Sequence, residues 1–285
     1  MPNIEKHLKK IEITEKSSQI SGIDYIYLIN LDRRPEKLAK SIQELRPFQI
    51  NPQRVSAIYG WTLSKEAFDD IGMKFVPPMD FSLSGQVFFR LASDQLDAGE
   101  PVNASSYGKT CVHQKTSAGS IGGSLSHLSC LQHAFDAGFE TIWILEDDFT
   151  VMRDPHELST FIKRLDTLVG ADSWDMLYTD DDHHFMPYGE MNLQLRPDRA
   201  PFRHRFEHTP IGTDFMKIGG RWQLHSIIYR RSGMKKILDH MKQFGLFHTL
   251  DVEINFTPNI QMYNLTCGLV HGRNRTVSDT QRKFF

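Results

Sequence analysis

Residues 141–148, with the sequence TIWILEDD, decide the fold class: an apolar run ends abruptly in Glu146, Asp147 and Asp148. Aromatic, aliphatic and β-branched residues without polar alternation are typical of a strand that is buried on both faces, as in a parallel sheet. Open α/β sheets bind their ligands at the carboxyl ends of such strands. The sequence therefore predicts a buried strand over 141–145 whose acidic end lies at the ligand-binding edge of the sheet.

The three carboxylates are costly to place at a strand end unless positive charge meets them. Successive side chains of a strand point to opposite faces, so Glu146 and Asp148 share a side, about 6–7 Å apart. Two carboxylates at this spacing can bind one hard divalent cation such as Mg²⁺ or Mn²⁺, which would in turn hold a phosphate. Asp147 points the other way and is expected to orient a neighbour or the chain. The alternative is a solvated strand end or helix cap.

Composition is that of a globular protein: 285 residues, 40% hydrophobic and 24% charged. The length suits one large α/β domain or two smaller ones. A net charge of −2 argues against a general nucleic-acid binder. Three cysteines without CxxC spacing fit a reduced, cytosolic interior. Residues 1–16 are too polar for a signal peptide or membrane span, and we expect a frayed or amphipathic leader whose lysines could touch an anionic surface.

Predicted strands alternate with predicted helices along the chain, which indicates an α/β domain with a largely parallel sheet. The expected strands are 25–30, 54–58, 141–145, 174–178 and 224–229. The expected helices are 36–45 (with Pro35 as first residue), 124–137, 155–169 and 232–242. Residues 62–116 are interpreted as helices and loops above the sheet, 180–220 as loop-rich, and 266–285 as irregular and basic.

Two loops could bind anions. Asp32, Arg33 and Arg34 follow the first strand and could bind a nucleotide, or form a solvated surface turn. The glycine-rich residues 119–123 precede a helix, as in a phosphate-binding loop, but lack the P-loop ending; a flexible helix entry is the alternative. His127 is expected to donate a hydrogen bond near this loop or to be a satisfied core histidine.

Two further acidic clusters stand out. Residues 180–184, DDDHH, follow a predicted buried strand and suit a transition-metal hydrolase site, although a solvated loop or a lining for a polar acceptor is the competing interpretation. Asp251 and Glu253 would share a face if their segment is extended. They could supply a catalytic base, a metal ligand or ordinary acids at a helix start.

Taken together and in order, these segments resemble a known family. The motifs are YLINLDRRPEK at 27–37, RVSA at 54–57, IGGSLSH at 121–127 and ILEDD at 144–148. The set is similar to glycosyltransferase family 25, which includes lipooligosaccharide galactosyltransferases and collagen hydroxylysine galactosyltransferases. The likeness covers roughly residues 24–280 and is weakest over 61–116.

The resemblance implies a Rossmann-like GT-A fold, a UDP-sugar donor (commonly UDP-galactose) and Mn²⁺ or Mg²⁺ held by Glu146 and Asp148 in place of the DxD carboxylates. Asp251 matches a late acidic position where activation of the acceptor is plausible. The residues implied near the donor are Asn30, Asp32, Arg33, Arg34, Ala57, Ser126, His127 and Asp147. The chain departs from the family pattern at Tyr59-Gly60, where the family usually has an acidic residue and glycine, so the resemblance does not supply a contact with the nucleotide base there. It also departs at 180–184, which points to a different acceptor.

We therefore expect a leader over 1–20 and one catalytic domain over 21–285, with a variable insertion at 61–116 near the acceptor site. The expected reaction moves a hexose, with galactose first, from a UDP-sugar to a hydroxyl of a glycan, lipopolysaccharide, lipid-linked glycan or protein, with inversion. Asp251 would be the base, with Glu253 behind it. Nucleic acid is not an expected partner. The expected location is cytoplasmic, including the inner face of the membrane. The alternatives are a phosphoesterase using Asp180 to His184 and an inactive, glycan- or partner-binding relative.

Overall fold

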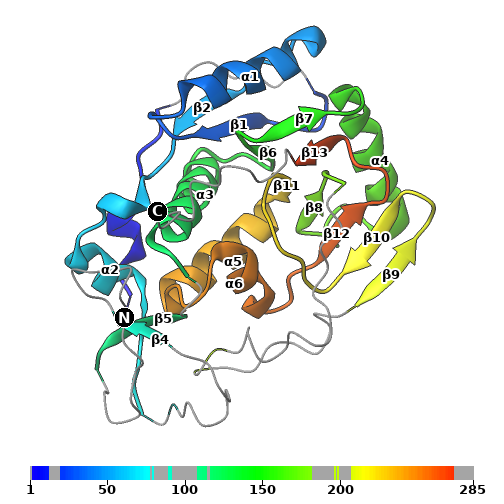
Figure 1. Cartoon of the computed structure of the whole chain (residues 1–285). Coiled ribbons are helices and arrows are strands. Elements are labelled where there is room, and N and C mark those ends of the chain that lie inside the picture. The colour runs from blue at the N-terminus through cyan, green and yellow to red at the C-terminus, as the bar shows by residue number, and fades with distance from the viewer. Residues whose placement is uncertain are drawn as a thin grey trace.

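The computed structural model describes residues 2–12, 20–77, 79, 89–91, 108–113, 116–181, 196, 198 and 207–272. An eight-stranded sheet in the order β2-β1-β6-β11-β8-β12-β10-β9 forms its centre (Figure 1). The strands are β1 (Tyr25–Asn30), β2 (Gln53–Ser56), β6 (Thr141–Glu146), β8 (Met176–Tyr178), β9 (His208–Ile211), β10 (Phe215–Ile218), β11 (Ser226–Arg230) and β12 (Met262–Leu265).

Strands β2, β1, β6, β8, β12 and β9 run in one direction, and β11 and β10 run in the other. The predicted α/β fold, with helices flanking a mostly parallel sheet, is confirmed. The insertion of β11, antiparallel to both β6 and β8, was not expected from the pattern of the sequence. It matters for function because the start of β11 lies at the carboxyl edge of β6.

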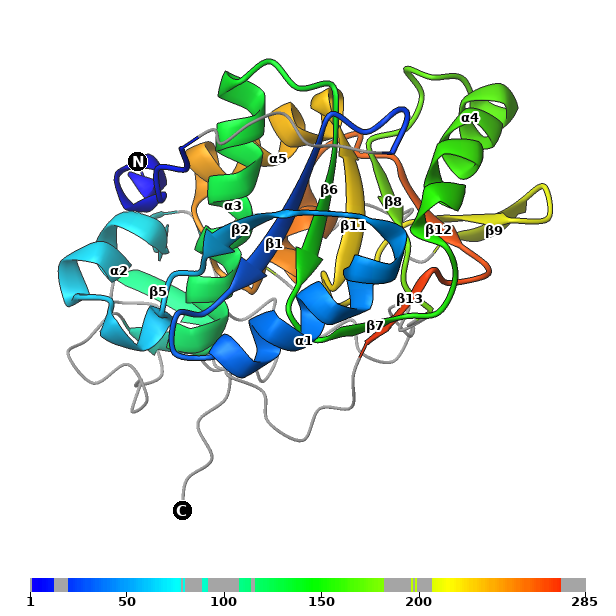
Figure 2. The same cartoon turned by 90° about the horizontal axis from the view of Figure 1, so that it is seen from above.

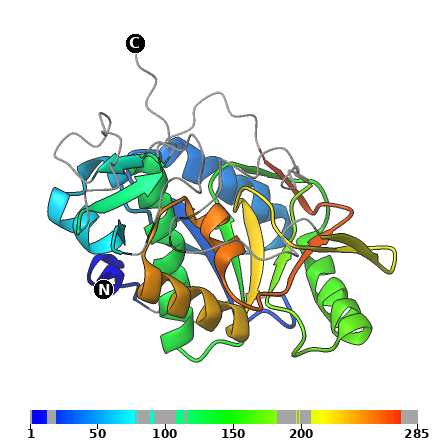
Figure 3. The ribbon, with the colours of Figure 1, turned by 90° about the horizontal axis from the view of Figure 1, so that it is seen from below.

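Helices cover both faces of the sheet, which explains why β1 and β6 are apolar without alternation (Figures 1 and 2). The helices are α1 (Pro35–Leu45), α2 (Lys65–Ile71), α3 (Ala118–Asp136), α4 (Leu158–Val169), α5 (Arg231–Phe244) and α6 (Leu250–Glu253). Side chains of α3 and α5 pack in one core with Tyr27 and Ile144. Side chains of α4, with Leu45 of α1, pack in a second core with Leu28 and Trp143. Figure 3 shows α3 and α5 side by side.

The strongest patterns were located correctly. β1 occupies the predicted residues, Pro35 opens α1, and β6 extends the predicted strand by one residue to Glu146. The other predicted helices and strands are present with shifted ends. The prediction of these segments is correct because a continuous apolar strand, or an amphipathic helix that begins with proline, is specified by residues close together in the sequence.

The glycine-rich residues 119–123 are not a loop, which corrects the phosphate-loop expectation. α3 begins at Ala118, capped by Ser117, whose side chain accepts a hydrogen bond from Ser120 N at 3.0 Å. Gly122 lies against the backbone of the segment after β2, and a Cβ there would come within 2.4 Å of Gly60 N and Ile58 O. The glycine therefore allows close packing of helix and chain instead of binding an anion.

Several short strands escaped sequence reasoning. Residues 62–116 contain α2 and an antiparallel sheet, ordered β3-β5-β4, where only helices and loops were expected. Its strands are β3 (Met73–Lys74), β4 (Phe89–Leu91) and β5 (Thr110–His113). The loop-rich region also holds the β9–β10 hairpin, and part of the tail forms β13 (Val270–Gly272), paired with β7 (Phe149–Val151). Strands of two to four residues are too short to show a period.

The amino-terminal residues 2–12 pack on the domain, whereas a frayed or amphipathic leader was expected. Ile4 is buried, Asn3 N donates to Asp70 O at 2.7 Å, and Lys6 pairs with Glu66 at 2.9 Å. In the part of the chain that the structure describes, no helix has both the length and the hydrophobicity needed to cross a bilayer.

Candidate functional site

The acidic end of β6 meets a histidine that sequence reasoning did not single out. Ligand atoms of Glu146, Asp148 and His225 all lie within 4.8 Å of one another. His225 Nδ1 is 3.1 Å from Asp148 Oδ1 and 3.4 Å from Glu146 Oε2. Two carboxylates and one imidazole form a mixed oxygen and nitrogen donor set. This set suits Mn²⁺ better than Mg²⁺, because Mg²⁺ prefers ligands that are all oxygen. These residues therefore fit a divalent transition metal.

The antiparallel direction of β11 brings His225 to this edge. Ser226, the first residue of β11, pairs with Leu145 near the end of β6, and Glu146 N donates to His225 O at 2.9 Å. Because the two strands run in opposite directions, His225, just before β11, lies beside the residues at the end of β6. The sequence feature that could have identified His225 is the pair of polar residues Gln223 and His225 directly before a buried strand.

Two histidines, His127 and His225, contact the Glu146 carboxylate and shift its pKa. His127 Nε2 lies 2.9 Å from Glu146 Oε1, whereas His225 lies nearer the other oxygen, Oε2. Burial raises the pKa of Glu146, but hydrogen bonds with His127 and His225 outweigh burial and lower it. Burial lowers the pKa of His225, but hydrogen bonds with Asp148 and Glu146 outweigh burial and raise it well above the ordinary value. Clustered carboxylates of this kind attract a cation.

Asp147 points to the opposite face of the sheet, as the pleat of the strand predicts. Its Oδ2 accepts a hydrogen bond from Asn30 Nδ2 at 2.6 Å, and Lys37 of α1 lies 3.8 Å from Oδ1. Burial raises the pKa of Asp147 to about 6, against the opposing hydrogen bond from Asn30. Asp147 therefore joins the acidic end of β6 to the loop that follows β1.

That loop and β2 form a second polar group. Arg54 donates to Asn30 Oδ1 at 3.2 Å and also pairs with Asp32. Ser56 Oγ donates to Asp32 Oδ2 at 2.7 Å, and Ala57 N donates to Asn30 O at 2.9 Å. Hydrogen bonds from Ser56 and Arg54 lower the pKa of Asp32. The structure therefore brings Asn30, Asp32 and Ala57 together beside the acidic end of β6.

The two arginines of this loop diverge. The Arg33 guanidinium lies over the Tyr59 ring, 4.7 Å from its centroid. Arg34 Nε donates to Glu36 Oε1 at 2.6 Å. Arg33 is exposed and Arg34 half-buried, so the loop presents positive charge at the sheet edge. Tyr59, the departure from the family pattern, serves as a platform for Arg33.

Ser126 and His127 are both buried in α3. Ser126 Oγ accepts from Ile58 N at 2.8 Å and donates to Gly122 O at 2.7 Å, so it ties α3 to the chain after β2. His127 is the buried histidine that the sequence allowed, and its Nε2 faces Glu146 instead of a glycine loop. Its contact with Glu146, one of the three potential metal ligands, is the feature that belongs to the site.

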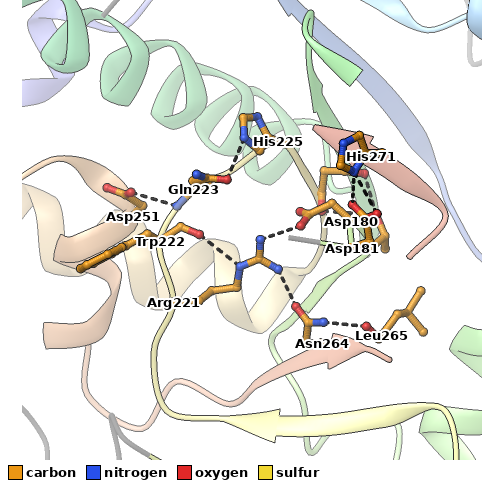
Figure 4. Close-up of polar contacts among 12 residues, drawn as sticks. Asp180, Asp181, Arg221, Trp222, Gln223, His225, Asp251, Asn264, Leu265 and His271 are labelled. Atoms are coloured by element: carbon orange, nitrogen blue, oxygen red, sulfur yellow. Dashed lines mark hydrogen bonds and ion pairs between the residues drawn. The ribbon is translucent and has the colours of Figure 1, made fainter. Parts of the chain in front are cut away.

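Asp180 does not lie in a solvated loop, which corrects that expectation for the first residue of the 180–184 cluster. It is fully buried and pairs with Arg221 at 2.6 Å (Figure 4). Burial raises the pKa of Asp180, against the effect of Arg221. Asp181 contacts the exposed His271 at 2.8 Å. Residues 182–184 of this predicted cluster lie outside the described residues.

Asp251 and Glu253 do not share a face, because α6 is helical and not extended. Glu253 is fully buried, pairs with Arg196 at 2.6 Å and accepts from the backbone N–H groups of Phe247 and His248. The Glu253 carboxylate is therefore surrounded by protein groups, and its predicted supporting role stays a prediction. Asp251 is half-buried and accepts from Gln223 N at 3.0 Å, from Val252 N and from Thr249 (Figure 4).

Comparisons with known proteins agree on one family. The family model described as "Glycosyltransferase family 25 (LPS biosynthesis protein)" matches residues 23–253. A "Glycosyltransferase 25 family member" of Aedes aegypti is 25% identical over 261 residues, covering 90% of this chain and 34% of that protein. An "Inactive glycosyltransferase 25 family member 3" of Mus musculus is 24% identical over 159 residues, covering 55% and 22% respectively. The chain thus spans about a third or less of these relatives.

Among solved structures, the mannose-1-phosphate geranyltransferase of Thermus thermophilus aligns with 87% of this chain and 74% of its own, at a TM-score of 0.35 and 8% identity. So low a likeness carries no argument about the site. The family model, in contrast, covers both the loop after β1 and the acidic end of β6, and it extends past His225 to Glu253. The chain belongs to glycosyltransferase family 25.

Proposed function

We propose that this protein is an Mn²⁺-dependent glycosyltransferase that moves a hexose, with galactose as first candidate, from a UDP-sugar to an acceptor hydroxyl with inversion. The observation that carries the proposal is the cluster of Glu146, Asp148 and His225 at the carboxyl edge of the sheet. Membership of the family supplies the class of reaction. The presence of this potential metal-binding cluster favours an active enzyme over an inactive relative.

The chain's residues divide the work between them. Glu146, Asp148 and His225 would hold the cation, which when bound would offset negative charge on the diphosphate leaving group. The Asn30–Arg34 loop is coupled to this edge through the 2.6 Å contact between Asn30 and Asp147 and would bind the nucleotide, with Arg33 and Arg34 offering positive charge.

Single displacement at the anomeric carbon needs a base for the acceptor hydroxyl. Asp251 is our candidate because it is half-buried and lies next to Gln223, the residue that contacts His225. One N–H group occupies its Oδ2, which leaves a lone pair of that oxygen for a proton. Burial of Glu253 against Arg196 favours Asp251 over Glu253 for this role.

For the acceptor we propose a glycan hydroxyl of a lipopolysaccharide-type or other lipid-linked saccharide, because the family description names LPS biosynthesis. A protein acceptor is the alternative outcome. We place the reaction in the cytoplasm, including the inner membrane face, because Cys111, Cys130 and Cys267 are all free thiols. The phosphoesterase alternative loses support because Asp180 is held in a buried ion pair.

The direct test incubates the full chain with UDP-galactose, UDP-glucose, UDP-N-acetylglucosamine, a GDP-sugar and a CMP-sugar, with and without Mn²⁺. We expect one UDP-sugar to raise the melting temperature only with Mn²⁺, since saturation at 100 times Kd stabilises by about 2.7 kcal/mol. We expect the same sugar nucleotide to be turned over, measured as UDP release.

The matched variants are Asp148→Asn and, as control, Asp239→Asn on the exposed side of α5. Asp148→Asn should lower Mn²⁺-dependent UDP release by roughly 100-fold or more because a metal ligand is lost, whereas Asp239→Asn should match the unaltered protein. Undiminished turnover by Asp148→Asn would overturn the metal assignment. Weak sugar-nucleotide binding that ignores Mn²⁺ would favour the inactive alternative.

A further inference from the structure

Beyond the cluster itself, we propose that Gln223 is the positioning residue that holds His225 in the orientation and tautomer of a metal ligand, an inference that rests on the proposed function. Figure 4 shows Gln223 between Asp251 and His225, just before the start of β11. Three observations support the proposal: the contact with the imidazole, the backbone conformation of Gln223, and the space beside the ring.

The first observation is the contact between the two side chains. His225 Nε2 lies 2.9 Å from Gln223 Oε1. An amide oxygen only accepts hydrogen bonds, so the hydrogen must be on Nε2. The other ring nitrogen, Nδ1, faces Asp148 and Glu146. A histidine ligand binds metal through an unprotonated ring nitrogen while the other N–H donates to an acceptor nearby, and Gln223 supplies that acceptor.

The second observation is the conformation of Gln223, which has a φ of +73°. Residues other than glycine rarely adopt this left-handed region, so the surrounding structure must hold the chain there. Asp251 does so on one side by accepting from Gln223 N at 3.0 Å. On the other side, Arg221 Nε donates to Trp222 O at 3.1 Å.

Arg221 is itself immobilised. Its guanidinium pairs with Asp180 at 2.6 Å, bonds to Asn264 and lies 4.3 Å from the centroid of the Tyr178 ring. Asp180 and Arg221 are both fully buried, at the carboxyl end of β8. The buried pair of Asp180 and Arg221 therefore anchors the segment that carries Gln223 and His225.

The third observation concerns Gly272 in β13, which passes beside the His225 ring. A Cβ at Gly272 would lie 3.2 Å from Cδ2 and 3.3 Å from Nε2 of His225. This is the ring edge that contacts Gln223, and the absence of a side chain at Gly272 lets β13 pack closely beside it. Register also fixes β13 here, since Gly272 pairs with Phe149, the residue after Asp148.

The experiment compares the unaltered chain with Gln223→Met, Gln223→Glu and the control Gln43→Met, which alters an exposed residue of α1. Titration with Mn²⁺ alone, followed by the EPR signal of the free ion, measures Kd without an activity assay. We expect Gln223→Met to weaken Mn²⁺ binding by about 10- to 100-fold, as loss of an outer-shell partner typically does. Gln223→Glu keeps an acceptor oxygen and should restore binding, and Gln43→Met should not differ from the unaltered protein.

Pulsed EPR of bound Mn²⁺ supplies a readout that a merely structural role would not move. We expect a nitrogen coupling from His225 that survives in Gln223→Glu and is altered or lost in Gln223→Met, with both variants folded by circular dichroism. Equal Mn²⁺ affinity and equal coupling in Gln223→Met, or equal losses in both Gln223 variants, would overturn the inference.

The outcomes also separate this inference from the proposed function. An unaltered protein that binds no Mn²⁺ would overturn both. Binding that His225→Ala abolishes and Gln223→Met leaves unchanged would overturn the role of Gln223 alone.

Discussion

At the residue scale, the acidic end of β6 shows how the pleat separates the roles of three consecutive carboxylates. Glu146 and Asp148 face His225, whereas Asp147 faces Asn30 and α1. Their pKa values diverge accordingly: hydrogen bonds with two histidines lower that of Glu146, and burial raises that of Asp147 to about 6. Chemically similar neighbours thus differ because the strand presents them to different surroundings.

Asp251 allows a clean test at the same scale. Asp251→Asn keeps an oxygen that can accept from Gln223 N but removes the basic carboxylate. If Asp251 is the base, kcat should fall by roughly 100- to 10,000-fold, the usual contribution of general base catalysis, while the Kd for Mn²⁺ stays unchanged. Steady-state kinetics together with the Mn²⁺ titration measure both quantities. An unchanged kcat would mean that Asp251 acts only through Gln223.

At the scale of elements, the position of α3 depends on Gly122. Gly122 lets the helix approach the backbone at Ile58 and Gly60, and this approach sets the position of Ser126 and His127 one turn later. His127 reaches Glu146 only because α3 lies this close to the sheet. The glycine-rich residues 119–123, which resemble an anion-binding loop in sequence, therefore serve to pack α3 closely against the neighbouring backbone.

Two alanine substitutions one residue apart test this explanation. Gly122→Ala should lower the free energy of unfolding by about 1–3 kcal/mol or more, because the new Cβ meets rigid backbone. Gly123→Ala has no atom within 4 Å of its Cβ. It should instead raise stability by about 0.5–1 kcal/mol, the ordinary gain of alanine over glycine inside a helix. Urea denaturation of both variants measures the difference, and equal effects would contradict the packing role.

At the scale of the whole molecule, buried ion pairs tie distant segments to the sheet domain. Arg196 pairs with Glu253 at 2.6 Å and with Asp198 at 2.8 Å, and it also donates to the carbonyl groups of Phe244 and Gly245. Both members of the Arg196–Glu253 pair have fully buried side chains. The pair thus links residue 196 to the end of α5 and to α6.

Breaking this pair should cost stability. Arg196→Met leaves the Glu253 carboxylate buried without its cation, and we expect a loss of about 3–5 kcal/mol in the free energy of unfolding. Chemical denaturation at neutral pH measures it. The control is Arg153→Met, which removes an exposed ion pair with Glu157 and should cost at most about 1 kcal/mol. Comparable losses would contradict the anchoring role.

The same pair predicts an acid dependence. Burial raises the pKa of Glu253, but Arg196, with His240 and His248, outweighs burial and lowers it below its ordinary value. A lowered folded-state pKa contributes stability above the unfolded pKa of about 4.3, and that contribution is lost as pH falls through the folded-state pKa. The free energy of unfolding should therefore decrease below about pH 4. Glu253→Gln should show a shallower decrease in denaturation curves recorded between pH 7 and 3.

The sequence alone determined the features that depend on near neighbours in the chain. The continuous apolar run before Glu146 specified a strand buried on both faces, Pro35 specified the start of α1, and the two-residue period placed Glu146 and Asp148 together. These features need no knowledge of distant segments.

Only the tertiary structure decided which charges are available for chemistry. Asp180 and Glu253 are candidate site residues in the sequence, but in the structure each lies in a buried ion pair, with Arg221 and Arg196 respectively, more than 40 positions away in the chain. His225 entered the site because β11 runs antiparallel to β6. Strand direction and ion-pair partners are set by long-range packing, since the energy of a buried charge depends on what surrounds it in space and not on what precedes it in the chain.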